Sequence, residues 1–84
     1  MSAPVNRGAP LPIDVDRALS DLNRAIAAKP DAASPLRWRG LVFAALGQKD
    51  KAIADFEAAL KLPDAKTVYG SVHRLVQEAL RGLK

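Results

Sequence analysis

The stretch DKAIADFEAAL at residues 50–60 repeats the pattern of DRALSDLNRAI at residues 16–26, which lies 34 residues earlier. Apolar and acidic residues coincide in the two copies, while the residues between them differ. The matching pairs are Ala18 with Ala52, Leu19 with Ile53, Asp21 with Asp55, Leu22 with Phe56, Ala25 with Ala59 and Ile26 with Leu60. A fixed period of this length is typical of an array of helical repeats.

Length and composition favour one small domain built only of helices. A chain of 84 residues buries only about 60–65% of the surface that its unfolded form exposes, so its core is modest. The sequence has no cysteine and one histidine, so neither a disulfide nor a metal site supplements that core. Strand-forming residues do not fall into alternating runs. We therefore expect no strand, no resident metal and no cofactor.

The net charge of +4 could indicate an acidic partner or a nucleic acid. However, lysines and arginines occur in all segments and, apart from Arg37 and Arg39, alternate with acids such as Asp50 and Asp55. This pattern predicts a mixed, solvated surface. The sequence also has no apolar run of about 18 residues and no signal peptide, so we expect a cytoplasmic protein without a membrane partner.

The chain is expected to consist of a flexible arm, residues 1–13, and one helical domain, residues 14–84. Pro4, Pro10 and Pro12 exclude a helix from the arm, because each proline removes a backbone donor. Asp14 can cap a first helix that ends at Pro30.

Ser34 and Pro35 predict the start of a second helix, with serine as the N-cap and proline in the first helical position. This helix should run to Leu46, and Gly47 fits the left-handed residue that commonly closes a helix. The short link that follows requires the third helix, residues 50–62, to fold back antiparallel. Pro63 and Asp64 should end the third helix and cap the next.

The last segment has apolar residues spaced by three and four, which predicts a fourth amphipathic helix. They are Val68, Tyr69, Val72, Leu75, Val76, Ala79, Leu80 and Leu83. His73 falls on the polar side of this helix, beside Arg74 and Gln77.

The sequence RGLVFAALG at residues 39–47, followed by AIADFEAAL at 52–60, closely resembles the tetratricopeptide repeat. Small Gly40 and Ala52 stand where the two helices of the repeat touch, Phe43 and Phe56 stand in its core, and Ala59 follows at a close contact. The match covers one full repeat, residues 33–64. Residues 16–30 resemble the second half of a preceding repeat, and the last helix resembles a terminal cap. The resemblance implies an all-α fold of antiparallel helix-turn-helix repeats: one and a half repeats plus a capping helix, four helices altogether.

The resemblance also implies a non-enzymatic module or adaptor that binds a protein, a peptide or a helix on its concave face. The corresponding positions here are Ser34, Arg37, Leu41, Ala44, Ala45, Lys66 and Arg74. Leu41 and Ala45 stand where the family's carboxylate-gripping residues would be, so that mode of peptide binding is not expected. Alternatively, Leu41 and Ala44 pack only against the adjoining helix.

The residues themselves bear on two other functions, catalysis and nucleic-acid binding. No nucleophile or carboxylate falls beside His73 by helical spacing, and no phosphate loop or metal motif is present, so we expect no enzyme. Arg37 and Arg39 flank Trp38, and such a cluster can bind nucleic acid. One cluster is a weak signal; a basic protein associated with nucleic acid is kept as an alternative, and we do not expect that partner.

The first helix has no partner within its own repeat, and repeat arrays commonly need about three repeats to bury a continuous core. Exposed apolar area of this kind usually marks an interface. We therefore expect a homodimer or other homo-oligomer, and a self-associating scaffold is a further alternative. The residues expected to mediate self-association are Val15, Leu19, Leu22 and Ile26.

Overall fold

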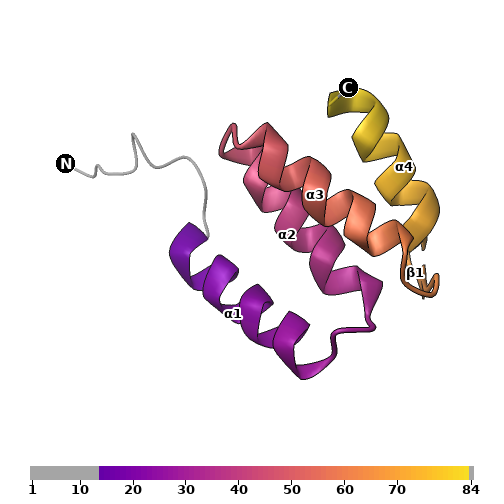
Figure 1. Cartoon of the computed structure of the whole chain (residues 1–84), viewed down its shortest axis with the longest axis horizontal. Helices are drawn as coiled ribbons and strands as arrows, with labels where there is room; N and C mark the ends of the chain where they lie inside the picture. Colours follow the sequence, from indigo (N-terminus) through magenta and orange to yellow (C-terminus); the bar gives the residue numbers. More distant parts are fainter. Residues whose placement is uncertain (1–13, 84) are drawn as a thin grey trace.

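A computed structural model of the chain describes residues 14–83, which form four helices and one very short hairpin. The helices lie side by side in chain order, with α1 at one end of the molecule and α4 at the other (Figure 1). The expected all-α array of four helices is confirmed, while the expected arm, residues 1–13, lies outside the described residues. The elements are α1 Val15–Ala28, α2 Ala33–Ala45, α3 Lys49–Leu60, β1 Lys66–Thr67, β2 Gly70–Ser71 and α4 Val72–Leu83.

Two of the expected helix ends are confirmed by their hydrogen bonds. Asp14 is the N-cap of α1, and its side chain accepts from the amide of Arg17 at 3.3 Å. Gly47 follows α2 with a φ of 79°, and the amide of Gln48 donates to the carbonyl of Phe43 at 2.9 Å. This left-handed glycine closes the helix by the Schellman pattern and turns the chain back into α3.

The expected start of α2 is wrong. The helix begins at Ala33 with Ala32 as its N-cap, and no side chain caps it, so Ser34 already lies within the first turn. Pro35 is tolerated there because the amides of the first turn have no partner within the helix. The other boundaries differ by one or two residues: α2 ends at Ala45 and α3 runs from Lys49 to Leu60.

The core lies between α2, α3 and α4. Phe56, Val72 and Val76 are its largest fully buried side chains. Gly40 is needed because of Phe56: a methyl group at Gly40 would lie 2.6 Å from Cε1 of that ring. The atoms that a methyl group at Gly40 would meet first belong to Phe56, and Ala52, the other small residue expected at this helix contact, is fully buried. Phe43, which was also expected in the core, is only partly buried and packs against the core cluster from outside.

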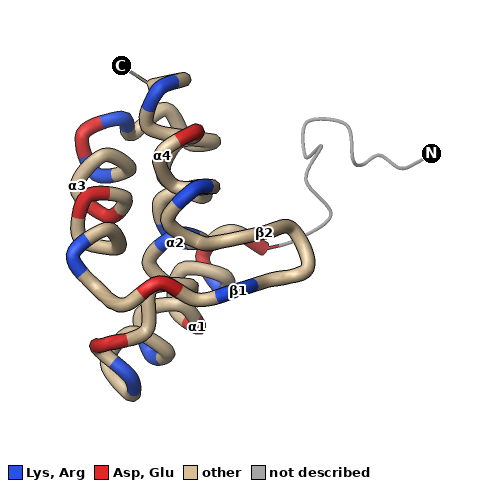
Figure 2. Tube along the Cα trace, turned by 90° about the vertical axis from the view of Figure 1, so that its right-hand side faces the viewer, with Lys and Arg blue, Asp and Glu red and all other residues tan. Residues whose placement is uncertain are grey.

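A two-stranded hairpin replaces the expected first turn of the last helix. β1 and β2 pair antiparallel, so the expectation of no strand is wrong, and α4 begins only at Val72. Gly70 has a φ of 115°, and Thr67 Oγ1 donates to its carbonyl at 2.9 Å, which holds the turn out of the helix. Val68 and Tyr69 form its tip and are 92% and 64% exposed, not part of an apolar stripe. The hairpin projects to one side of the helices (Figure 2).

Candidate functional site

The residues expected to bind a partner lie mainly along one face of α2, at helical spacings of three and four. Leu41 and Ala44 are half-buried and pack against the core cluster, while Ala45 is exposed. Lys66 is exposed in β1, and Arg74 is exposed in the first turn of α4, a helix that contacts α2. This set is called the α2 face below and comprises Ser34, Arg37, Leu41, Ala44, Ala45, Lys66 and Arg74.

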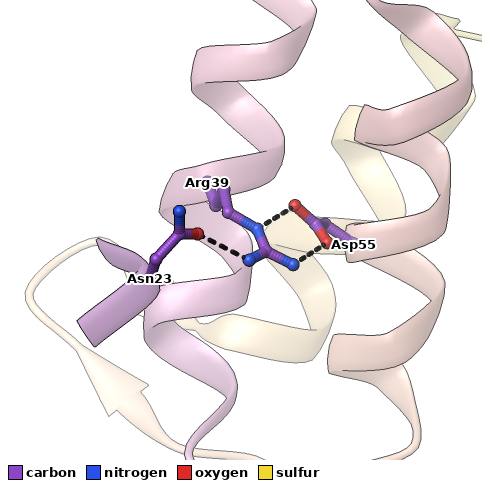
Figure 3. Close-up of polar contacts among 3 residues, drawn as sticks. All are labelled: Asn23, Arg39 and Asp55. Atoms are coloured by element: carbon purple, nitrogen blue, oxygen red, sulfur yellow. Dashed lines mark hydrogen bonds and ion pairs between the residues drawn. The ribbon is translucent and has the colours of Figure 1, made fainter. Parts of the chain in front are cut away.

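A partly buried ion pair between α2 and α3 was not predicted from the sequence. Arg39 on α2 donates from Nε and Nη2 to the two carboxylate oxygens of Asp55 on α3, each at 2.7 Å, and from Nη1 to Asn23 Oδ1 on α1 at 2.8 Å (Figure 3). Asp55 is only 6% exposed. The hydrogen bonding of Arg39 to Asp55 is the main reason that the pKa of Arg39 is raised above its usual value. The expectation that Asp55 belongs to a mixed, solvated surface is therefore wrong.

A sequence signal for this pair existed. Asp55 falls within the stripe of Ala52, Phe56 and Ala59, three or four residues from two of its members and next to the third. An acid within the buried stripe of a helix needs a partner, because a buried charge is costly unless it is paired. Arg39 precedes the close-contact residue Gly40, which places it at the edge of the same interface.

Arg37 and Arg39 do not act together as a basic cluster. The guanidinium of Arg37 lies over the ring of Trp38, 4.6 Å from its centroid, whereas Arg39 is held by Asp55. Trp38 is exposed. Acidic and basic residues are interspersed along α3 and α4 (Figure 2). The Arg-Trp-Arg cluster thus offers one arginine stacked on one tryptophan, and its second arginine is engaged inside the protein.

His73 is not the solvated side chain that its helix position predicted. It is half-buried, and Nε2 lies 2.6 Å from the carbonyl oxygen of Leu62, to which its N–H donates. The carboxylate of Asp64 and the hydroxyl of Ser71 lie near His73. Asp64 accepts hydrogen bonds from Ser71 Oγ at 2.6 Å and from the backbone amide of His73 at 2.9 Å. The ring of His73 bonds neither of them. This arrangement caps α4 and does not form a nucleophile-base pair.

The hydrogen bonds at the start of α4 change the pKa of Asp64. The pKa of Asp64 is lowered to about 2, first by the hydrogen bond from Ser71 and then by that from the amide of His73. Ser71 itself accepts from the amide of Arg74 at 3.2 Å, as an N-cap serine does. Asp64 therefore helps to fix the start of α4, although the helix begins eight residues later and not directly after Asp64 as expected.

The stripe expected to mediate self-association is only partly covered by the described chain. No residue of α1 is fully buried, and α1 packs against α2. Ile26 packs against the core cluster, and the other members of the stripe are partly buried. The set remains Val15, Leu19, Leu22 and Ile26.

A family model described as tetratricopeptide repeat matches residues 12–81. The chain belongs to the tetratricopeptide repeat family. This family is typically a non-catalytic fold for protein–protein interaction. No curated protein and no solved structure gave a significant match.

The described residues carry no feature of a membrane span or a metal cluster. The longest of the helices between residues 14 and 83 has 14 residues, and none could cross a bilayer. Over the same residues, no group of three metal-ligating side chains comes together.

Proposed function

We propose that this chain is a non-enzymatic interaction module or adaptor that binds a peptide or a helix of another protein on its α2 face. Membership of the tetratricopeptide repeat family supports an interaction module in general. The α2 face supports the location, because it combines a half-buried apolar centre with exposed basic residues at its edge. Partner sites with an apolar centre and a polar rim are the usual form of protein interfaces.

The observation that carries the location is the distribution of apolar side chains around α2. The helix buries Ala33, Leu36 and Gly40, yet Leu41 and Val42 on other sides keep exposed area, and Leu46 beyond its end is exposed. A helix that is apolar all round needs cover on more than one side. Contacts with α1, α3 and α4 supply part of that cover, and a bound peptide would supply more.

The test compares two exposed alanines on different helices. Ala45→Glu puts a carboxylate on the α2 face, and Ala54→Glu puts the same group on α3, outside that face. A partner captured with the wild-type chain and identified by mass spectrometry should be lost with Ala45→Glu and kept with Ala54→Glu. Equal capture by both variants contradicts the location. Leu41→Glu serves as a second variant, with circular dichroism to show whether this half-buried position still permits folding.

A second candidate function is self-association, so that the chain serves as a homodimeric or homo-oligomeric scaffold. The specific observation in its favour is that α1, an amphipathic helix, buries none of its residues. Apolar area left uncovered in this way commonly marks an interface. The cytoplasmic location expected from the sequence stays a prediction.

A further inference from the structure

α1 has the sequence of a helix covered from two sides, whereas the described chain covers it from one. The 34-residue period aligns α1 with α3, and the residues that α3 buries have counterparts in α1 of which none is buried. The buried residues of α3 are Ala52, Asp55, Phe56 and Ala59, and their counterparts, called the open face below, are Ala18, Asp21, Leu22 and Ala25.

The open face is incompletely covered, since Asp21 is exposed and Ala18, Leu22 and Ala25 are only partly buried. Asn23 is the residue of α1 that meets Arg39 of α2. Successive residues of a helix are turned by about 100°. Asn23 and Asp21 therefore lie on opposite sides of Leu22, each about 100° away. Since Asn23 faces α2, Asp21 faces away from it.

In α3 the equivalent face is covered by α2, which shows what a covering helix must supply. It supplies an arginine for the acid, Arg39 against Asp55, and a small residue for the large apolar side chain, Gly40 against Phe56. The covering residues, Arg39 and Gly40, are consecutive, and so are the residues that they cover, Asp55 and Phe56. A helix that covers α1 in the same way must therefore lie antiparallel to it and carry an arginine followed by a small residue.

α1 itself carries that pair as Arg24 followed by Ala25. If α1 of a second copy lies antiparallel on the open face in the register of α2 on α3, its Arg24 meets Asp21 and its Ala25 meets Leu22. Because all four residues belong to the same helix, a two-fold axis at the level of residue 23 makes both contacts twice. Such an isologous contact closes on itself and gives a dimer.

The sizes of the paired side chains agree with this arrangement. Gly40 is required in α2 because a methyl group there would lie 2.6 Å from the ring of Phe56. The counterpart of Phe56 in α1 is Leu22, a smaller side chain. The space that it leaves suits the methyl group of Ala25.

The charges agree as well. Asp21 and Arg24 are both exposed, and the ion pairs found among residues 14–83 include neither of them. Within α1, Asp21 precedes Arg24 by three residues. Antiparallel pairing about residue 23 therefore brings the acid of each helix toward the base of the other.

We propose that α1 pairs with α1 of a second copy in antiparallel orientation, with Asp21 bound by Arg24 of the second copy and Leu22 packed on Ala25 of the second copy. The inference rests on the self-association proposed above and specifies its geometry. One pair of short helices buries less area than the roughly 1,600 Å² of a standard interface, so the expected dissociation constant is on the order of micromolar.

The test is sedimentation equilibrium of the full chain at about 5–200 µM, a range that brackets such a constant. Asp21→Arg and Arg24→Asp each place like charges together and should raise the dissociation constant at least about tenfold. The combined variant Asp21→Arg/Arg24→Asp restores opposite charges across the two-fold axis and should return the constant to within about threefold of wild type. Asp16→Arg, an exposed charge reversal on the same helix outside the open face, is the matched control and should leave it unchanged.

A second measurement uses the absence of cysteine from the sequence. The variant Leu22→Cys should form a disulfide-linked dimer on mild oxidation, because the two copies of residue 22 lie close to the axis. Ser20→Cys, on the opposite side of α1, should not. Circular dichroism of each variant checks that the helices are retained.

The outcomes separate this geometry from the broader proposals. A wild-type chain that stays monomeric throughout overturns self-association and the geometry together. A dimer that both single charge reversals leave intact, or that the combined variant fails to restore, overturns the geometry and leaves self-association standing. If Ala45→Glu breaks the dimer while Asp21→Arg and Arg24→Asp leave it intact, the contact lies on the α2 face, and the proposed α1–α1 geometry is overturned.

Discussion

Arg39 and Asp55 form a two-pronged ion pair across the α2–α3 hairpin, with Nε and Nη2 of the arginine each 2.7 Å from one carboxylate oxygen. The same guanidinium reaches Asn23, so one side chain connects α1, α2 and α3 (Figure 3). Paired geometry of this kind fixes the relative position of the helices, because both oxygens and both donors are satisfied together. The pair holds in place the elements that carry the α2 face and the open face.

Breaking this pair from one side should be costly. Arg39→Met leaves Asp55, a residue that is 6% exposed, without its cation, and the free energy of unfolding should fall by roughly 2–4 kcal/mol. Arg39→Met/Asp55→Leu removes both charges and should recover much of that loss, because no charge then remains buried. Urea denaturation followed by circular dichroism measures all three proteins. Equal losses in the single and the double variant would contradict the argument.

A second ion pair, on the surface of α4, provides the control. Arg74 and Glu78 are both exposed and lie 3.5 Å apart on α4. Such surface pairs contribute little, since water and salt screen them. Arg74→Met should change the free energy of unfolding by less than about 0.5 kcal/mol.

The contact of Gly40 with Phe56 predicts a pair of coupled substitutions. Gly40→Ala should lower the free energy of unfolding by about 1–2 kcal/mol, since overpacking against the ring outweighs the gain in helix propensity. Phe56→Leu should also destabilise the core. In the double variant Gly40→Ala/Phe56→Leu the smaller side chain makes room for the methyl group, so the combined loss should be smaller than the sum by about 1 kcal/mol. Strict additivity in urea denaturation would count against this packing.

Features that depend on local chemistry could be predicted from the sequence. The left-handed residue after α2 needs only a glycine at Gly47, and the cap of α1 needs only an acid at Asp14. The 34-residue period aligned α1 with α3 before any contact was known. These signals act within a few residues or within one repeat, so a single sequence contains them.

Features that depend on contacts between elements could not be predicted in the same way. Val68 and Tyr69 have the spacing of a helix, but α4 begins only after them. The hydrogen bonds of Thr67 and Asp64 and the positive φ of Gly70 form a turn there instead. The charges of Arg39 and Asp55 resemble solvated residues until α2 and α3 are placed together. The sequence indicated which helices carry the candidate site. Which side of α1 contacts α2 became clear only from the hydrogen bond between Asn23 and Arg39.

The hairpin tip should contribute little to stability. Val68 and Tyr69 are among the most exposed apolar side chains of the described chain. Replacing both with serine should change the free energy of unfolding by no more than about 0.5 kcal/mol, because surface positions without specific contacts tolerate substitution. Thermal unfolding of Val68→Ser/Tyr69→Ser measures this. A larger loss would mean that the tip packs against the protein.

The cap of α4 should make stability depend on pH in acid. Asp64 has a pKa lowered to about 2 by bonds from Ser71 Oγ and the amide of His73. An unfolded aspartate titrates near 3.9, so the carboxylate stabilises the folded chain above that pH, and the contribution is lost as pH falls toward about 2. Asp64→Asn should therefore unfold at a lower temperature than wild type at pH 6, and the difference should close between about pH 4 and pH 2. Asp31→Asn, an exposed acid in the α1–α2 link, should show no such gap, and a gap for Asp64→Asn that persists at pH 2 would rule out the charge as its cause.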